Sequence, residues 1–439
     1  MQTLAQLRAG RLGRVTRLQL AENLTEFPRE IFSLADSLEV LDLSNNGLSS
    51  LPDDFDRLQR LKILFLSNNQ FEQVPRVLGK CPKLEMIAFK ANRIHSLAEG
   101  ALPERTRWLI LTDNKLRQLP ESMGKLYRLQ KLALAGNELT SLPDTMADCH
   151  GLELVRLSAN RLTALPDWLL QLPRLAWLAF GGNPLCRPVA GEPVAATVPK
   201  VKLADIALTE RLGEGASGVI FRGKWRPAVA GLAGAESEIA VKLFKGAVTS
   251  DGYPEDELDC CLTAGGHPNL IRVIGQIAEP EQLGLVMELI PDDFSNLGLP
   301  PSLASCTRDT FAPGTEFSTA EIAAMARQMA ATLAHLHRRG VSHGDVYAHN
   351  IMANAAADIL FGDFGAASNL AALPAAQRRA MEAIEVRAFG CLLDDLLGQN
   401  AGEDRAQRAE LQALAQSCMQ GQVALRPGFD ALADRLQVG

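Results

Sequence analysis

Residues 38–52 read LEVLDLSNNGLSSLP, a frame in which regularly placed leucines surround Asn46. The frame recurs through the first half of the chain, and each copy carries an asparagine. These asparagines are Asn23, Asn46, Asn69, Asn92, Asn114, Asn137, Asn160 and Asn183. They are 23 residues apart (46 to 69), except for one step of 22 residues (92 to 114). A unit this short cannot bury its own leucines, so we expect stacked units that share one core over residues 15–186.

This frame resembles that of the leucine-rich-repeat family, whose fold is an α/β solenoid. Each x-Leu-x-Leu-x segment predicts a short strand with its leucines directed inward, so that the intervening side chains face the concave side. In the family, the asparagine side chain bonds to backbone where the chain leaves the strand. The first copy, near Leu24, and the last copy, near Asn183, depart from the frame. Atypical end units are expected because they cap the stack.

Apolar side chains occupy the expected concave positions of three consecutive repeats. They are Ile63, Phe65, Met86, Ala88, Trp108 and Ile110, with Trp177 in the same column further along. Neighbouring strands lie roughly 4.8 Å apart, so these side chains predict a contiguous apolar surface. Such a surface usually marks a contact site. We expect it to bind a protein substrate or regulator, or this chain's own second domain; an apolar ridge without a partner is the alternative.

A glycine-rich segment opens the second half, after a predicted linker over residues 187–203. Gly213, Gly215 and Gly218 form a Gly-x-Gly-x-x-Gly-x-Val pattern that ends at Val219. A dinucleotide-binding loop with similar glycines opens a helix, whereas residues 219–225 favour a strand. The pattern therefore predicts a hairpin whose backbone N–H groups approach phosphates. Residues 239–242 read IAVK and place Lys242 on the next strand, where it could neutralise phosphate charge.

Residues 343–350 read HGDVYAHN, and an Asp-Phe-Gly triplet begins at Asp363. Phosphoryl transfer needs a carboxylate to orient the incoming hydroxyl, oxygen ligands for Mg²⁺ and positive charge on the phosphates. Asp345, Asn350 and Asp363 offer these oxygen groups in the order and spacing of a protein kinase. Residues 204–439 therefore resemble the protein kinase family, which implies an α+β bilobal fold.

The resemblance implies roles for individual residues, with ATP and Mg²⁺ as cofactors. Asp345 would be the base, His343 would support its loop, and Asn350 and Asp363 would hold Mg²⁺. Glu257 would pair with Lys242, although Glu255 and Asp259 are alternatives. Residues 285–290 resemble the hinge, with Met287 as gatekeeper, and residues 385–390 and 425–429 resemble anchors of the C-lobe. The implied nucleotide contacts are Leu212, Gly213, Gly215, Gly218, Val219, Ala240, Lys242, Glu257, Met287, Glu288, Ile290 and Met352.

Three departures from the kinase pattern predict unusual regulation. Gly344 replaces the arginine that often grips a phosphorylated activation loop in the family, and Ser368 is the only hydroxyl side chain in residues 365–385. We expect activity that does not depend on phosphorylation of this loop. The Ala-Pro-Glu motif is missing, although Glu382 could pair with Arg426, so the platform for a substrate peptide is reduced. Tyr347 replaces the lysine of serine/threonine-type enzymes.

Composition limits the remaining possibilities. The net charge of −7 gives no basic stripe for nucleic acid, and no apolar run approaches the length of a membrane span. The eight cysteines lack paired spacing, which favours free thiols in a reducing cytoplasm. We expect a cytoplasmic protein kinase that modifies Ser/Thr before Tyr. A pseudokinase or repeat scaffold, and a kinase-fold enzyme that acts on a small molecule, are the alternatives.

Overall fold

The computed structural model describes residues 2–186, 198–215, 217–226, 238–245, 252–402 and 404–438. The chain divides into two compact units, Met1–Leu175 and Ala176–Gly439. Most of the linker expected over residues 187–203 lies outside the described residues. None of the described helices is both long enough and apolar enough to cross a membrane.

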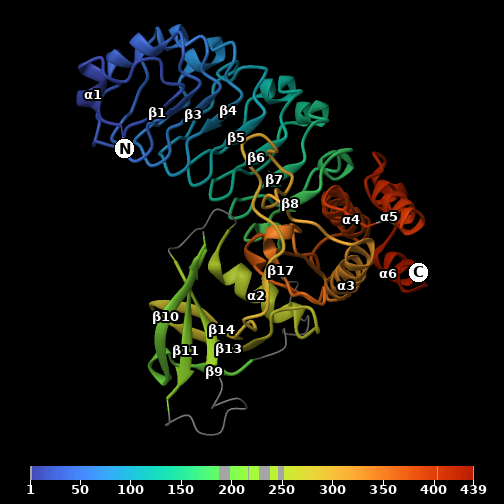
Figure 1. Cartoon of the computed structure of the whole chain (residues 1–439). Coiled ribbons are helices and arrows are strands. Elements are labelled where there is room, and N and C mark those ends of the chain that lie inside the picture. The colour runs from blue at the N-terminus through green and yellow to red at the C-terminus, as the bar shows by residue number, and fades with distance from the viewer. Residues whose placement is uncertain are drawn as a thin grey trace. The chain divides into compact units, whose positions relative to one another are not determined.

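The first unit is a stack of short parallel strands that follow helix α1 (Leu4–Arg8). The strands are β1 (Arg17–Gln19), β2 (Val40–Asp42), β3 (Ile63–Phe65), β4 (Met86–Ala88), β5 (Trp108–Ile110), β6 (Lys131–Ala133) and β7 (Leu154–Arg156). They pair in chain order, and the central leucines lie in register, as Leu41 does with Leu64. Both leucines are fully buried, as the repeat frame predicted. Figure 1 shows these strands side by side in blue and teal.

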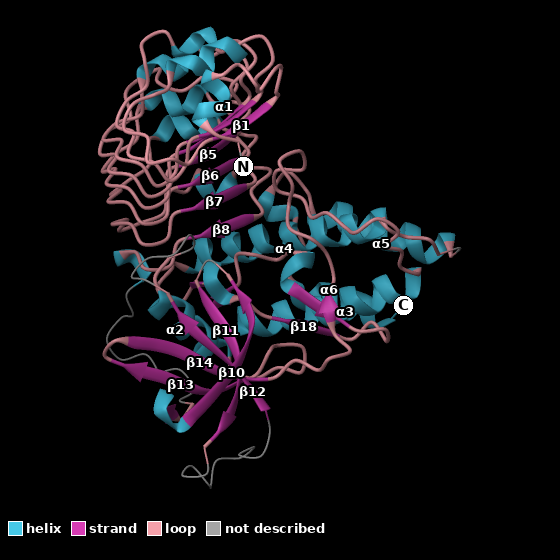
Figure 2. Cartoon of the chain, turned by 60° about the vertical axis from the view of Figure 1, so that its left-hand side comes forward, coloured by secondary structure: helices cyan, strands magenta, loops and turns pink. Residues whose placement is uncertain are grey.

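Short 3-10 helices return the chain between most of these strands (Figure 2). They are η1 (Arg29–Leu34), η2 (Phe55–Arg57), η3 (Arg76–Lys80), η4 (Glu121–Lys125) and η5 (Asp144–Asp148). Two of them begin directly after the Leu-Pro of the frame: Pro120 is the N-cap residue of η4, and Pro143 is that of η5. Proline suits this place because its fixed φ is compatible with a helix start and its missing N–H has no partner to lose there.

The repeated asparagines bind backbone, as the resemblance implied. The Asn137 amide donates to the carbonyl oxygens of Leu111 and Leu134, both at 2.9 Å. Its Oδ1 accepts from the Leu116 N–H at 3.0 Å. The side chain is buried, and buried backbone groups need partners. A short amide that both donates and accepts satisfies three of them at once, which explains why asparagine is repeated.

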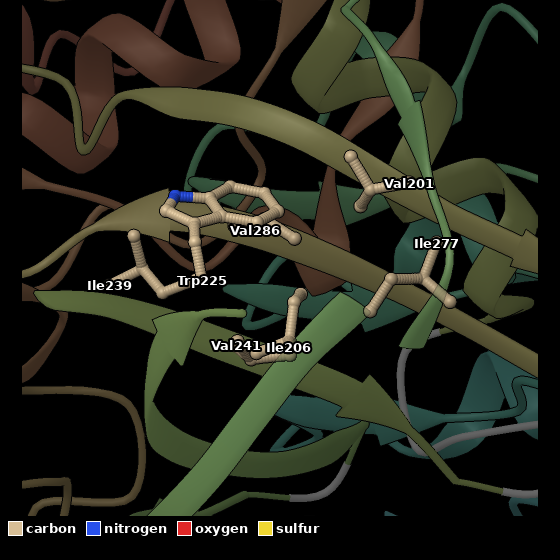
Figure 3. Close-up of a cluster of buried hydrophobic side chains, with 7 residues drawn as sticks. All are labelled: Val201, Ile206, Trp225, Ile239, Val241, Ile277 and Val286. Carbon is tan, nitrogen blue, oxygen red and sulfur yellow. The ribbon is translucent and has the colours of Figure 1, made fainter. Parts of the chain in front are cut away.

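The second unit contains an N-lobe built on a six-stranded sheet, in the order β10-β11-β12-β14-β13-β9. The strands are β9 (Lys200–Val201), β10 (Ile206–Glu214), β11 (Gly218–Trp225), β12 (Glu238–Phe244), β13 (Val273–Glu279) and β14 (Gln282–Glu288). One face of the sheet carries a buried apolar cluster that includes Trp225, Ile239 and Val241 (Figure 3). Because side chains alternate along a strand, Ala240 and Lys242 point to the opposite face.

The C-lobe is mostly helical and contains α3 (Thr319–Arg338), α4 (Ala375–Gly398), α5 (Arg405–Cys418) and α6 (Phe429–Val438) (Figure 1). A Ser318–Glu321 capping box starts α3. Helix α2 (Pro254–Ala264) lies between β12 and β13 in the chain. Short strands carry the functional loops: β15 (Ser295–Asn296), β16 (Val341–Ser342), β17 (Ile351–Ala353), β18 (Ile359–Phe361) and β19 (Ser368–Asn369). The observed α+β bilobal fold confirms the prediction.

The last copy of the repeat frame lies in the second unit. Strand β8 (Trp177–Ala179) follows the unit boundary at Ala176, and the short helix η7 (Pro184–Cys186) follows β8. Asn183 donates its amide to the Phe180 carbonyl oxygen at 2.8 Å, as earlier asparagines do within their own repeats. The repeat pattern in the sequence therefore continues past the point where the second compact unit begins.

Candidate active site

Lys242 and Glu257 form an ion pair that joins strand β12 to helix α2. Their side chains are only 10% and 3% exposed. The Lys242 Nζ also lies 3.6 Å from Oδ1 of Asp363. Burial opposes the charge on Lys242, but Asp363 and Glu257 outweigh it and raise the pKa of Lys242. Of the three carboxylates considered from sequence, Glu255 and Asp259 are exposed, and Glu257 is the one that reaches Lys242.

His343 is fully buried and lies in the catalytic loop, residues 343–350. It links this loop to the residue between strand β18 and Asp363. Its Nε2 lies 2.9 Å from the Gly362 carbonyl oxygen, which can only accept, so Nε2 carries the hydrogen. The ring stacks on Phe361 with a centroid separation of 4.0 Å. Burial lowers the pKa of His343, which keeps the imidazole neutral. The geometry suits the supporting role expected from sequence.

Asp345 and Asn350 lie together at the end of the same loop. The Asn350 amide donates to Oδ2 and to the carbonyl oxygen of Asp345, both at 3.0 Å. Asp345 is partly exposed, so an incoming hydroxyl could approach its carboxylate. The hydrogen bond from the Asn350 side chain fixes the orientation of that carboxylate, as a positioned base requires.

Asp363 adopts a left-handed backbone conformation, with φ of 59°. This conformation is uncommon for a residue with a side chain and is often found at functional sites. Its Oδ1 accepts from the Gly365 N–H at 3.3 Å. Nearby protein atoms oppose its ionisation, but Lys242 and the Gly365 N–H hold the pKa of Asp363 below its usual value. The ionised side chain is 58% exposed and can reach a ligand.

The residues implied as Mg²⁺ ligands suit that ion chemically. Asn350 and Asp363 offer an amide oxygen and a carboxylate, which are hard oxygen donors. Mg²⁺ usually takes one or two protein groups and completes its shell with water and phosphate oxygens. Among the described residues, no cluster of three or more His, Cys, Asp or Glu side chains could hold a metal ion by itself.

Most residues expected to contact nucleotide come from β10, β11, β12, β14 and β17, whereas Glu257 comes from α2, and Gly215 and Ile290 lie just after β10 and β14. The glycine loop is a hairpin, as predicted, with the Gly215 N–H bonded to the Gly218 carbonyl oxygen at 2.9 Å. A Cβ built on Gly213 or Gly215 would meet nothing within 4 Å, so a ligand can approach the backbone there. Leu212 and Glu288 are exposed, Ala240 is buried, and Val219, Met287, Ile290 and Met352 are half-buried.

Glu385 binds the catalytic loop from helix α4. The sequence placed residues 385–390 among the anchors of the C-lobe but did not predict this contact. Its Oε1 accepts from the Gly344 N–H at 2.7 Å and from the Ser342 hydroxyl at 3.1 Å, and its Oε2 lies 2.7 Å from His337 Nε2. Burial opposes ionisation, but His337 and the Gly344 N–H hold the pKa of Glu385 below its usual value. The signal was a carboxylate directly between the apolar residues Ile384 and Val386 of α4, because a buried charge needs partners.

Asp309 is a second anchor that the sequence did not reveal. It lies in the loop before α3 and is 8% exposed. Its Oδ2 accepts from the Ala348 N–H at 2.7 Å, and its Oδ1 lies 2.9 Å from Nδ1 of His349. The catalytic loop is thus held from both sides of Asp345. No motif or period in the sequence marked Asp309.

The apolar positions predicted on the concave side differ in exposure. Ile63, Phe65, Trp108 and Ile110 are half-buried. Met86 is 6% exposed, because Ile63 and Trp108 flank it in register on the neighbouring strands, and Ala88 is also buried. Trp177 is 2% exposed, and its indole contacts the catalytic loop, so of the partners expected from sequence it meets this chain's own kinase domain and is closed to an outside protein.

Two of the departures have visible structural counterparts. Gly344 has φ of 73°, and a Cβ built on it would lie 2.4 Å from the Ala366 carbonyl oxygen, so an arginine does not fit this conformation. Ser368, the hydroxyl after the Asp-Phe-Gly triplet, is fully buried. Arg426 donates to the carbonyl oxygens of Gln420 and Ala383, and its pairing with Glu382 stays a prediction.

Comparisons with known proteins agree with this arrangement. Residues 206–389 match the family described as protein tyrosine and serine/threonine kinase. Residues 13–71, 104–162 and 127–185 match the leucine-rich-repeat family. The chain therefore combines leucine-rich repeats with a protein kinase domain, as its motifs predicted.

The similar proteins are kinases. A protein described as a probable serine/threonine-protein kinase from Dictyostelium discoideum is 30% identical over 168 residues, which is 38% of this chain and 10% of that protein. The CTD kinase subunit alpha of Schizosaccharomyces pombe is 28% identical over 42% of this chain and 28% of its own length. Serine/threonine-protein kinase PkaA of Streptomyces coelicolor is 34% identical over 33% of this chain and 26% of its own length. The chain thus spans less than a third of each of these relatives.

Proposed function

We propose that this chain is an ATP- and Mg²⁺-dependent protein kinase that transfers the γ-phosphate to a protein hydroxyl. The observation that carries this proposal is the buried Lys242–Glu257 pair, with Asp363 at 3.6 Å from Lys242. In active kinases the corresponding lysine–glutamate pair and aspartate must both be in place. An inactive scaffold has no functional need to keep a buried ion pair, which is costly to desolvate.

Each residue then has a defined task. Lys242 neutralises the phosphates that stay on the nucleotide, and Glu257 aims the lysine side chain. Asn350 and Asp363 would hold Mg²⁺, which supplies positive charge to the transferred phosphate. Asp345 orients the acceptor hydroxyl and takes its proton, while the amide of Asn350 holds the carboxylate in place. We expect serine or threonine as acceptor before tyrosine, because the similar proteins are named serine/threonine kinases.

The proposal is tested by incubating the purified full chain with labelled ATP and Mg²⁺. We expect transfer to the chain itself or to added protein, with label on serine or threonine in phosphoamino-acid analysis. Lys242→Met should reduce transfer by about 100-fold or more, because one preorganised charge is lost. Lys224→Met removes an exposed lysine of β11 that pairs with Glu238, and this control should leave transfer unchanged. Equal loss in both variants would contradict the assigned role of Lys242.

A small-molecule phosphotransferase is the second candidate, because the segment after the Asp-Phe-Gly triplet is short. Helix α4 already begins at Ala375, soon after β19 (Ser368–Asn369). A protein substrate normally docks on this segment, whereas a small acceptor would not need it. Turnover of ATP with a mixture of hydroxylated metabolites, and no transfer to any protein, would favour this candidate.

We also propose that the concave side of the first unit binds a protein, through Ile63, Phe65, Trp108 and Ile110. Its support is their partial exposure on β3 and β5, the two strands that flank β4. In a comparison of cellular phosphoproteins, Phe65→Asp should change which proteins are modified without changing self-labelling. Tyr127→Asp, at a residue 61% exposed, is the control and should change neither. Identical phosphoprotein patterns for Phe65→Asp and wild type would contradict the proposal.

We place the protein in the cytoplasm. The structure describes all eight cysteines, none of them in a disulfide, and most of them are buried. Thiols outside disulfides are typical of a reducing compartment. Fractionation of cells that produce the chain would test this placement.

A further inference from the structure

Trp177 makes two contacts with the catalytic loop. Its indole N–H donates to the Val346 carbonyl oxygen at 3.1 Å. Its ring is stacked on Tyr347, with centroids 4.7 Å apart and planes 5° from parallel. Trp177 and Tyr347 are 2% and 3% exposed. Because Val346 and Tyr347 directly follow Asp345, these contacts restrict the backbone that carries the base.

The residues after Trp177 contact the segment that follows the Asp-Phe-Gly triplet. The Phe180 N–H donates to the Ser368 hydroxyl at 3.0 Å. A Cβ built on Gly181 would lie 3.2 Å from the Ala367 carbonyl oxygen, so the two backbones pass closely. Ser368 is in turn paired with Ser342 between β19 and β16, at the start of the catalytic loop. One short stretch thus touches both loops of the site.

Gly182 extends these contacts to helix α2. It has φ of 72°, and a Cβ built on it would lie 2.5 Å from Oδ2 of Asp256 and 2.6 Å from the Tyr253 ring. A side chain there would be strained by the positive φ and would have to displace the Asp256 carboxylate and the Tyr253 ring at the start of α2. Asp256 is the residue before Glu257, so the position of α2 determines whether Glu257 reaches Lys242.

Gly344 shows why this stretch matters for regulation. A Cβ at Gly344 would lie 2.4 Å from the Ala366 carbonyl oxygen and 3.2 Å from that of Leu178. Backbone from the loop after Asp363 and from β8 therefore occupies the place where the family carries the phosphate-gripping arginine. The Lys242–Glu257 pair and the Asn350–Asp345 bond are formed with this backbone in place.

We infer that residues 177–182 form a permanent brace that holds the catalytic loop, the segment after Asp363 and helix α2 in the active arrangement. The inference rests on the proposed kinase function for its effect on rate. The brace takes over the task that a phosphorylated activation loop performs through its arginine. Trp177 and Gly182 are then positioning residues, which act through Asp345 and Glu257 without touching substrate.

The test uses full-length variants in two assays. Trp177→Phe keeps an aromatic ring but removes the N–H, and Trp168→Phe is its matched control, because Trp168 donates to Asp144 on the surface of the first unit. Gly182→Ala adds a strained φ and a clash with the side chains of Asp256 and Tyr253 at the start of α2. Its matched control is Gly100→Ala, because Gly100 has φ of 69° and an added Cβ there would meet nothing within 4 Å.

We expect kcat to fall in Trp177→Phe, by up to about 100-fold as for other small misplacements of a reacting group, with KM for ATP unchanged. Gly182→Ala should lower kcat and raise KM for ATP, because the Lys242–Glu257 pair is disturbed. Amide hydrogen exchange should become faster in residues 341–350 and 364–370 of both variants, and both controls should behave as wild type.

Amide hydrogen exchange is measured without any phosphoryl transfer, so it tests the brace separately from the proposed kinase function. If wild type transfers no phosphate but the variants still show faster exchange, the proposed function fails while the brace stands. Unchanged exchange in both variants would overturn the brace. A rise in kcat would also overturn it, because the contacts would then restrain activity instead of supporting it.

Discussion

Asp256 offers a quantitative test of the packing around helix α2. Burial, and then the nearby carboxylates of Asp259 and Glu255, raise the pKa of Asp256 to about 6 from an ordinary value of 3.8. Among the described residues, its buried Oδ2 has no hydrogen-bond partner. The folded protein therefore carries an unfavourable charge at neutral pH, and Asp256→Asn should remove it.

The size of the effect follows from this shift. A folded pKa of about 6 against 3.8 is roughly two pKa units, and each unit is about 1.4 kcal/mol, so ionisation costs the fold up to about 3 kcal/mol above pH 7. Loss of a negative charge from the first turn of α2 opposes this by about 0.5 kcal/mol. We expect Asp256→Asn to be more stable than wild type by about 2 kcal/mol at pH 7.5.

The direction of the pKa shift of Asp256 determines how the stability depends on pH. Because the folded pKa is raised, stability linked to this group is present below pH 3.8 and is lost as pH rises through about 6. Thermal unfolding of the full chain should show Asp256→Asn a few degrees above wild type at pH 7.5, at roughly 2 °C per kcal/mol, with a clearly smaller gap at pH 5. Asp434→Asn, at an exposed position of α6, is the control. No gap at pH 7.5, or the same gap at pH 5, would refute the reasoning.

Three further predictions concern the repeats and the anchors of the catalytic loop. Asn137→Ala should destabilise the first unit by about 3 kcal/mol or more in urea unfolding, because three buried backbone groups lose their partner. A loss of stability below about 1 kcal/mol would contradict the stabilising role given to the repeated asparagines. Glu385→Gln should destabilise the second unit by about 3 kcal/mol at pH 7, because it breaks the buried contact with His337. The pKa of Glu385 is lowered, so its contribution is present above pH 4.5 and disappears as pH falls further; a pH-independent difference would contradict this. Asp309→Ala should lower kcat without changing KM for ATP, since it frees Ala348 and His349, and an unchanged kcat would remove Asp309 from the loop's anchors.

Local patterns were enough to predict much of this molecule. The repeat frame placed Ile63 and Phe65 on the concave side of one short strand, and they are the first and last residues of β3. Spacing also selected Glu257 as the partner of Lys242. These predictions succeed because a repeat period and a short motif depend on residues that are close together in the sequence.

Contacts between distant segments were not predictable in the same way. Asp309 and Glu385 bind the catalytic loop from separate elements, and no spacing connects them to Asp345. Trp177 was assigned to an apolar column because its place in the frame matches Trp108. Its burial depends instead on Tyr347, far along the chain, so only the folded structure reveals that contact.

The central claim is that Asp345 serves a working phosphoryl-transfer site. The most direct measurement compares wild type with Asp345→Asn and with Asp358→Asn, an exposed aspartate of the same lobe. We predict that all three proteins are stabilised equally by Mg-ATP, while transfer of the γ-phosphate falls by about 1,000-fold in Asp345→Asn alone. Transfer that survives in Asp345→Asn, or that is missing from wild type, would contradict the account.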